Sequence, residues 1–142
     1  MINAHEIRDI LKIGIEITTE KIKSRLLEKM LEKAMAIANC DAGTLYIVKD
    51  GALYFRIMKT LSMNVDKGKN GEHIDLPPVA LKEENVCAYA ALHRELINIQ
   101  DVNHSEKFDF SGPMRYDKMT GYHTKSMLVI PMEDAEGNVI GV

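Results

Sequence analysis

The sequence is poor in cysteine, with only Cys40 and Cys87 among its 142 residues. A small secreted domain held together by disulfides usually carries more cysteine, so this pair favours a reduced, cytoplasmic protein. Long apolar runs are also lacking. No stretch approaches the length of a membrane span, and the first residues lack the basic-then-apolar pattern of a signal peptide. We therefore expect no membrane contact by this chain.

An excess of basic charge is lacking too. The sequence has 18 lysines and arginines against 21 aspartates and glutamates, a formal net charge of −3 at pH 7. Proteins that wrap nucleic acid usually carry a basic surplus, so we expect no nucleic-acid partner. The composition, with 46% hydrophobic and 27% charged residues, is that of an ordinary folded domain, and the chain is long enough to bury one core.

The motifs of common catalytic sites are missing. There is no GxSxG elbow, no HExxH helix and no CxxC pair. Neither cysteine has a neighbouring histidine, so neither resembles an activated nucleophile. The histidines lie far apart in the sequence and build no metal site on one element; they are His5, His73, His93, His104 and His123. We expect no catalysis, no metal and no required cofactor.

Two amphipathic helices are expected at the N-terminus. In residues 3–18 apolar positions recur every three or four residues, although several β-branched side chains weaken the pattern. Thr18 or Thr19 can cap a second helix within residues 19–38, where an apolar stripe opposes a charged side. The first helix either packs on its own domain or pairs with a copy of itself. Its place outside the expected sheet favours a homodimer.

A β-hairpin is expected next. Residues 44–49 and 52–60 are rich in β-branched and aromatic side chains, as strands are. They flank Asp50-Gly51, one of the strongest short-range hairpin signals. The turn residues and the two β-rich runs therefore both predict a β-hairpin over residues 44–60.

The middle of the chain predicts shorter elements. Glycine, lysine and proline dominate residues 61–79, which we expect to be a loop with one extended edge segment at 73–76. A short helix is expected at 86–94 and a short strand at 96–100.

A long connection occupies residues 101–120, and it combines aromatic with polar side chains. Connections of this length in compact domains are often functional, and this composition suits a lid or pocket wall for a flat, polar ligand. A surface loop anchored by Phe108 and Phe110 explains the pattern equally well.

The last segment, residues 121–142, contains two apolar runs at 127–132 and 139–142, joined by a polar connector with Gly137. The first run is apolar on both faces, which is typical of a strand in the middle of a sheet that is covered on both sides. Because the second run stops at the last residue, we expect the chain to be a fragment of a longer one.

Taken in order, these segments resemble a GAF domain over about residues 20–142. The most specific motifs are Asp41–Val48, Ile97–Val102, Phe108–Ser111 and Thr120–Val142. Within that family the sequence is most similar to the branch of cyclic-nucleotide phosphodiesterases and bacterial signalling proteins, including those with HD-GYP output domains.

The resemblance implies an α+β fold related to PAS domains. It has a central antiparallel sheet of about five to six strands, with helices on one face and a loop-roofed ligand pocket on the other. Residues 1–18 then form an N-terminal dimerisation or signalling helix, and residues 19–142 form a GAF domain without its last helix.

The resemblance also implies a candidate pocket. In nucleotide-binding members it is lined by the segment after the LINIQ-like strand and by the turn into the GYxT strand. The matching positions, with Tyr116 of the long connection, are Asp101, Val102, Phe108, Tyr116, Asp117, Thr120 and Thr124. In this interpretation Asp101 reads a purine edge, Phe108 stacks on the base, and Thr120 and Thr124 donate to a phosphate.

Part of the family pattern lies beyond this sequence. The Asn-Lys…Phe…Asp-Glu signature of phosphodiesterase GAF domains would begin just after Val142. We expect an attached output domain, in a parent protein that is a phosphodiesterase, a phosphohydrolase or a histidine kinase.

Three functions compete at this point. The first is a regulatory sensor in which a small ligand, such as a cyclic nucleotide, orders residues 101–120 and biases the helices that lead to an output domain. The second is a dimerisation and relay module whose pocket is filled by its own side chains. The third is reduction of free methionine sulfoxide, which some GAF domains perform with several loop cysteines; two cysteines disfavour it. Covalent bilin attachment is disfavoured because Ala88 follows Cys87.

Overall fold

The computed structural model describes residues 3–142, which divide into two units. Unit 1 comprises the chain up to Leu45 together with Phe55–Leu76, and unit 2 comprises Tyr46–Tyr54 together with Pro77–Val142. We describe each unit by itself.

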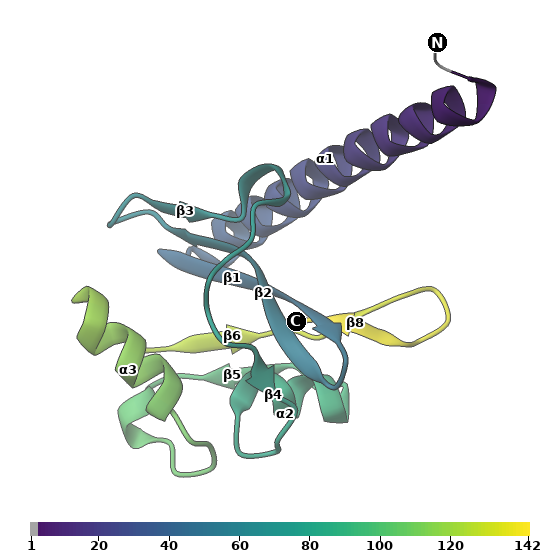
Figure 1. The fold of residues 1–142 in the computed structure, drawn as a ribbon. Helices are drawn as coiled ribbons and strands as arrows, with labels where there is room; N and C mark the ends of the chain where they lie inside the picture. Colours follow the sequence, from purple (N-terminus) through teal and green to yellow (C-terminus); the bar gives the residue numbers. More distant parts are fainter. Residues whose placement is uncertain (1–2) are drawn as a thin grey trace. The chain divides into compact units, whose positions relative to one another are not determined.

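The elements follow one another from the N-terminal helix to the C-terminal strand (Figure 1). Unit 1 contains α1 (Ala4–Ala38), β3 (Val65–Lys67) and the 3-10 turn η1 (Lys69–Gly71). The chain boundary between the units falls within β1 (Ala42–Lys49) and β2 (Ala52–Thr60). The elements of unit 2 are β4 (Val79–Ala80), α2 (Val86–His93), β5 (Ile97–Ile99), η2 (Val102–His104), α3 (Ser111–Thr120), β6 (Met127–Val129), β7 (Met132–Glu133) and β8 (Val139–Gly141).

Helix α1 is continuous, so the predicted start of a second helix at Thr18 or Thr19 is wrong. A capping box begins the helix: the Asn3 side chain accepts from the Glu6 backbone N–H, and the Glu6 carboxylate accepts from Asn3 N–H. The Thr18 hydroxyl donates to the carbonyl of Gly14 at 2.9 Å, and this bond satisfies the hydroxyl inside the helix. Asn39 ends the helix in the left-handed conformation (φ 54°), which asparagine adopts more readily than most residues.

Within unit 1, polar contacts hold the second half of α1. Ser24, Leu31 and Met35 are buried. Arg56 on β2 donates from Nη2 to Ser24 Oγ at 2.6 Å and to Glu20 Oε1 at 2.9 Å. Because Ser24 is fully buried, its hydroxyl needs this partner, and the arginine is satisfied at the same time.

The predicted hairpin is confirmed. Asp50 (φ 49°) and Gly51 (φ 72°) both lie in the left-handed region, which is the geometry of the turn that best matches strand twist. The strand order in the larger, six-stranded sheet is β3-β2-β1-β8-β7, with β4 paired to β2 off this path. The strand pairs β1–β8, β2–β3, β2–β4 and β7–β8 are all antiparallel. This α+β architecture with an antiparallel sheet agrees with the predicted fold class.

Some strand predictions are wrong in detail. The run 127–132 forms β6 and the start of β7. Among residues 3–142, β6 pairs only with β5, in a separate two-stranded sheet. The run 127–132 therefore does not form a central strand of the larger sheet. Of the two apolar runs in 121–142, the second forms β8, which lies inside that sheet between β1 and β7. Residues 73–76 form no strand, since the edge pairing to β2 is made instead by β4. The predicted loop also contains β3.

The core of unit 2 gathers around α2. One cluster contains Val86 and Ala90 of the helix together with Ile97, Phe108 and Phe110. The small alanines of α2 let the helix approach the strands closely, and the branched and aromatic side chains fill the space between them. The chain connection over 101–120 is more ordered than predicted, because half of it forms α3. Within residues 3–142, no helix is long and apolar enough to cross a bilayer.

Candidate functional site

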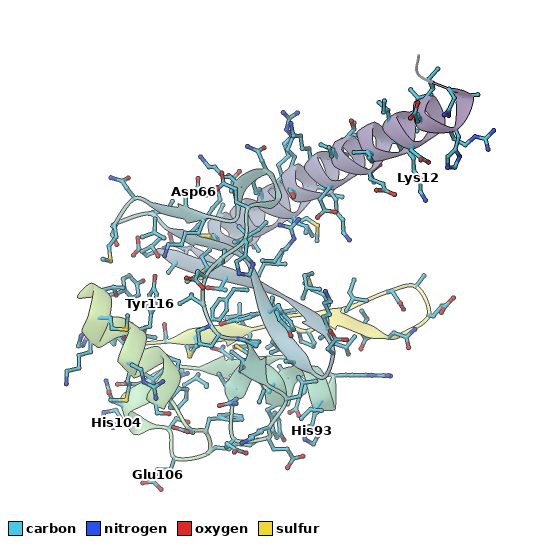
Figure 2. All side chains as sticks on the ribbon, viewed as in Figure 1. Lys12, Asp66, His93, His104, Glu106 and Tyr116 are labelled. Carbon is cyan, nitrogen blue, oxygen red and sulfur yellow. The ribbon has the colours of Figure 1, made fainter. Side chains whose placement is uncertain are left out.

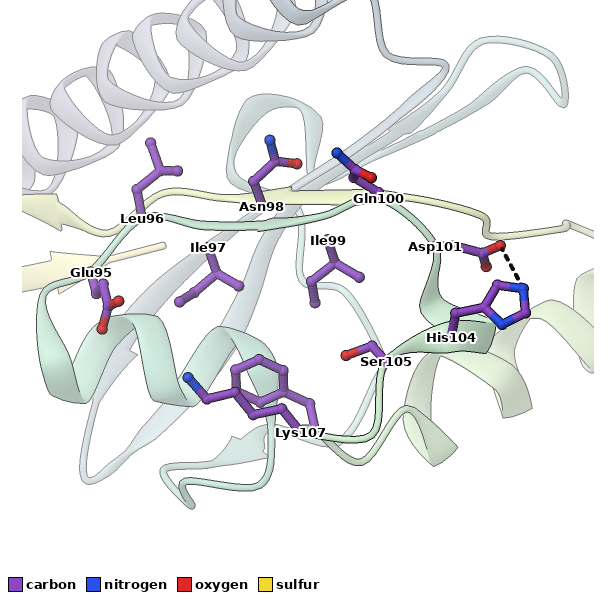
Figure 3. Close-up of a pocket in the computed structure, with 11 residues that line it drawn as sticks. Glu95, Leu96, Ile97, Asn98, Ile99, Gln100, Asp101, His104, Ser105 and Lys107 are labelled. Atoms are coloured by element: carbon purple, nitrogen blue, oxygen red, sulfur yellow. Dashed lines mark ion pairs between the residues drawn. The ribbon is translucent and has the colours of Figure 1, made fainter.

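An open hollow of about 620 Å³ runs along β5 in unit 2 (Figure 3). One side of the hollow is the continuous stretch from Glu95 to Asp101. The other side comes from the segment after η2 and includes Ser105, Lys107 and Phe108. A volume of this size lies within the range of small-ligand sites.

The local sequence explains why β5 borders an open space. Ile97 and Ile99 are buried and point to one face of the strand, while Leu96, Asn98 and Gln100 point to the other (Figure 3). This is the period-two alternation of a strand with one face on the core. In the described part of the chain β5 pairs with β6 alone, so its second edge carries no strand.

Lys107 is the basic group of the hollow. Its Nζ lies 4.4 Å from the centroid of the Tyr89 ring and 5.3 Å from that of Phe108, and it donates to Tyr89 Oη at 3.3 Å. These cation–π contacts orient the ammonium group without neutralising it. Among residues 3–142 no carboxylate forms an ion pair with it, so it can still attract an anion.

Asp101 stands at the far end of the hollow. Its Oδ1 accepts from the Asn103 backbone N–H at 2.9 Å and caps η2, and its Oδ2 lies 3.6 Å from His104 Nε2. One carboxylate oxygen is therefore occupied by the backbone. The other carries the interaction with an exposed histidine, which a ligand can replace.

The structure brings only part of the predicted set together. Asp101 and Phe108 line the hollow, whereas Val102 is buried in the core. Phe108 is 9% exposed, and its ring meets those of Tyr89 and Phe110 edge to face. A ring packed this way can border a ligand with its edge, but most of its face is already used.

The remaining predicted residues do not line the hollow. Asp117 accepts from the backbone N–H of Thr124 at 2.7 Å and from its hydroxyl at 2.8 Å. The Thr120 hydroxyl donates to the carbonyl of Tyr116 at 2.8 Å. Both threonine hydroxyls therefore already donate within the chain, and together these contacts fix the end of α3 to the segment that follows it.

Nine of the eleven lining residues were missed by sequence reasoning: the stretch 95–100, and His104, Ser105 and Lys107 after it. Lys107 precedes Phe108 directly, and a cation next to an aromatic residue in a long connection is a weak signal for an anion site. Its contact with Tyr89 on α2 was not predictable, because the two residues meet only when the connection folds back on the helix.

Cys87 is not placed for nucleophilic chemistry. Cys40 and Cys87 are free thiols. Burial raises the pKa of the Cys87 thiol to about 11, and the hydrogen bond with Tyr46 offsets only part of that rise. A thiolate nucleophile needs the opposite shift.

We therefore expect iodoacetamide at pH 8 to modify Cys87 about 100-fold more slowly than an ordinary thiol, because the thiolate fraction falls tenfold for each unit of pKa. The measurement is mass spectrometry of a Cys40→Ser variant, in which Cys87 is the one remaining thiol. Unfolding in urea is the control and restores the ordinary rate. Rapid labelling of the folded variant contradicts the assignment.

The chain matches the family model of the GAF domain over residues 24–142. The chain belongs to the GAF domain family. Dual 3',5'-cyclic-AMP and -GMP phosphodiesterase 11A of Takifugu rubripes is 37% identical over 59 residues, which cover 42% of this chain and 6% of the relative. Dual 3',5'-cyclic-AMP and -GMP phosphodiesterase 11 of Drosophila melanogaster is 25% identical over 143 aligned positions. These cover 94% of this chain and 9% of the relative. This GAF domain thus spans under a tenth of either relative.

Solved structures agree on the fold of this GAF domain. The GAF domain of a phosphoenolpyruvate-protein phosphotransferase from Coxiella burnetii superposes with a TM-score of 0.58 at 19% identity, over 92% of this chain and 73% of its own. The type II free methionine-R-sulfoxide reductase of Thermoplasma acidophilum gives a TM-score of 0.57 at 20% identity, over 86% of this chain and 72% of the reductase chain. At such identities the likeness concerns the fold alone. GAF domains are in general regulatory and sense small ligands, although the second neighbour is an enzyme.

Proposed function

We propose that this GAF domain is the regulatory sensor of a signal-transduction protein and binds a small anionic ligand in the hollow along β5. The observation that carries the proposal is Lys107, whose ammonium group is oriented by Tyr89 and Phe108 but has no carboxylate partner within the described part of the chain. An oriented and unneutralised cation beside an open hollow favours an anionic group of a ligand.

A cyclic nucleotide is the first ligand to test. It combines a flat base with one negatively charged phosphate, and relatives of this domain are phosphodiesterases of cyclic nucleotides by name. Lys107 would meet the phosphate, and Asp101 would accept from the base. Tyr116, Asp117, Thr120 and Thr124 would act on the ligand only through the position of α3.

The setting of the sensor is part of the proposal. We infer a cytoplasmic protein, since both cysteines are free. We also infer a bacterial type, from the resemblance to bacterial signalling proteins. An attached output domain, of the HD-GYP, other phosphodiesterase or histidine kinase kind, would receive the signal. The relay would pass through the helices next to the sensor. A ligand changes the output only if it binds one conformation of the domain and these helices more tightly than another.

Calorimetry with cyclic AMP and cyclic GMP tests this function, using the domain and its Lys107→Met variant. Methionine keeps the apolar stem over the rings and removes the charge. We expect binding by the parent domain and about 10- to 100-fold weaker binding by the variant, since a charge-assisted hydrogen bond contributes about 1.5–3 kcal/mol.

The matched control is Lys118→Met, which removes an exposed lysine of α3 that does not line the hollow. It should bind as the parent does. Equal affinity of the Lys107→Met variant and the parent would place the ligand elsewhere. If neither cyclic AMP nor cyclic GMP binds, either to this chain or to a longer one, the proposal that the ligand is a cyclic nucleotide is contradicted.

A second function has an observation in its favour. Phe108 and Phe110 are turned inward, at 9% and 6% exposure, so the chain fills with its own side chains part of the space that a ligand would need. A dimerisation and relay module without ligand would have this property. If replacing Phe108 with alanine creates binding of small aromatic probes that the parent lacks, this second function is favoured.

A further inference from the structure

Every residue from Glu95 to Asp101 lines the hollow along β5. A pocket on one face of a strand would be lined by alternate residues, because successive side chains point to opposite faces. A hollow that borders residues of both faces in unbroken order lies along the edge of the strand instead. The hollow therefore follows the edge of β5 that carries no strand in the described part of the chain (Figure 3).

The backbone of this edge is unpaired. Residues 97–99 pair with residues 127–129 on their other side. Apart from that ladder, the described part of the chain shows no backbone hydrogen bond for residues 96–100. In an antiparallel ladder only alternate residues bond to the partner strand, so the residues between them direct N–H and C=O to the free edge. Such an edge is a template for one more strand.

The hollow has room for a short strand. A strand residue occupies about 160 Å³, the product of the rise along the strand, the spacing between strands and the separation of packed sheets. The volume of about 620 Å³ corresponds to about four such residues. Addition of an extended peptide to a sheet edge draws its affinity from main-chain hydrogen bonds and its specificity from alternate side chains.

The charges at the ends of this edge disfavour the pairing of two copies of the chain. Glu95 and Asp101 lie at equal distances in sequence from Asn98. If two copies pair antiparallel about Asn98, each Glu95 faces Asp101 of the second copy, and like charges directly opposite are destabilising. A strand with a basic residue at each end, six positions apart, meets an opposite charge at both ends instead.

The wall opposite β5 adds a positive charge, Lys107. Its Nζ lies 5.3 Å from the ring centroid of Phe108, which packs in one cluster with Ile97 and Ile99. Residues of an added strand directly opposite Ile97 and Ile99 point to the same face as these isoleucines, so an acidic residue there faces Lys107. Glu106 does not line the hollow, and Figure 2 shows it pointing away from β5.

We propose that the free edge of β5 binds an extended peptide segment of a partner protein as an added strand. The segment has a basic residue at each end, six positions apart, and an acidic residue between them opposite Ile97 or Ile99. This partner site goes beyond the small-ligand function and does not depend on it. Because the peptide and a small anion both need Lys107, the two exclude one another.

Calorimetry with the capped heptapeptide KTETVTK and its reversed sequence KTVTETK tests the charge pattern. In an antiparallel strand the two orders place glutamate opposite Ile99 and Ile97 respectively. Threonine and valine favour the extended conformation. We expect one of the two peptides to bind, and its charge-exchanged form, with lysine and glutamate interchanged, to bind at least tenfold more weakly. The reason is that three opposite-charge pairs become like-charge pairs.

Glu95→Lys reverses one end of the edge without changing its backbone. We expect this variant to bind the heptapeptide about fivefold more weakly, and to regain affinity for a peptide with glutamate at the matching end. Recovery by glutamate at the last position indicates an antiparallel strand, and recovery at the first a parallel one. Glu136→Lys is the matched control, at an exposed acid of the same unit that does not line the hollow, and should bind as the parent does.

Amide hydrogen exchange decides whether the peptide pairs with the edge. An added strand slows exchange at alternate residues within 96–100, those whose N–H groups face the free edge. Binding without this alternate protection overturns the proposal, and so does the absence of binding by both heptapeptides. Protection of these amides that rises with protein concentration alone identifies a second copy as the occupant and also overturns it.

The outcome is separate from that of the small-ligand function. If neither cyclic nucleotide binds, the peptide results stand as they are. If a nucleotide binds and neither heptapeptide does, the peptide proposal alone fails. If both bind, we expect the nucleotide to displace the peptide.

Discussion

Replacing Gly68 with alanine is expected to lower the free energy of unfolding by about 3 kcal/mol, the sum of a left-handed backbone at about 1–2 kcal/mol and a steric overlap at about 1–3 kcal/mol. Gly68 has φ 88° and precedes η1, and a Cβ at this position would overlap the carbonyl oxygen of Arg56. The strand cannot move away easily, because the Arg56 side chain is tied to Glu20 and Ser24 of α1.

Gly51→Ala separates the two contributions. Gly51 has a similar backbone, with φ 72°, but an added Cβ meets no atom within 4 Å. We expect this variant to lose about 1 kcal/mol, the cost of the backbone conformation alone. Urea unfolding followed by circular dichroism measures both variants. Equal losses would show that the approach of Gly68 to the Arg56 carbonyl carries no steric cost.

Replacing Leu53 with alanine is expected to cost about 2–5 kcal/mol, because it leaves a cavity in a well-packed region. Leu53 on β2 is 0% exposed and lies against Ala88 and Ala91 of α2. Those alanines are too short to fill the space left by the leucine side chain. The loss therefore falls on the contact between the strand and the helix that supports Tyr89 and, through it, Lys107.

The control is Leu128→Ala, a leucine on β6 of the same unit that is 43% exposed. It should lose about 1 kcal/mol, since less area is withdrawn from water and no closed cavity forms. Differential scanning calorimetry compares the two variants with the parent. If Leu53→Ala unfolds no more easily than Leu128→Ala, α2 is not packed on β2 in solution.

The sensor and the helix α1 pose separate questions. The hollow along β5 depends on Lys107 and the segment around it, all within unit 2. Helix α1 belongs to unit 1. Ligand binding and association can therefore be altered one at a time, and a change of association on ligand addition would measure the coupling between them.

The sequence by itself determined the local structure. The Asp50-Gly51 turn and the strand at 96–100 were both predicted, because turn residues and period-two alternation act within a few residues. Four short motifs, from Asp41–Val48 to Thr120–Val142, carried the resemblance to the GAF family, which the family match then confirmed. The unbroken course of α1 was missed, since threonine suits a cap as well as a helix interior where its hydroxyl bonds the preceding turn.

Only the tertiary structure decided which groups meet. It paired Thr124 with Asp117 inside the chain, turned Phe108 inward, and brought Lys107 to Tyr89, a residue 18 positions away. It also left apolar side chains of α1 such as Ile7, Leu11 and Ile15 exposed, which a helical pattern alone cannot distinguish from a core face. The physical reason is that sequence patterns report how the chain arranges itself over one or two turns. Contacts between distant segments depend on packing and chain reversal, which no local pattern contains.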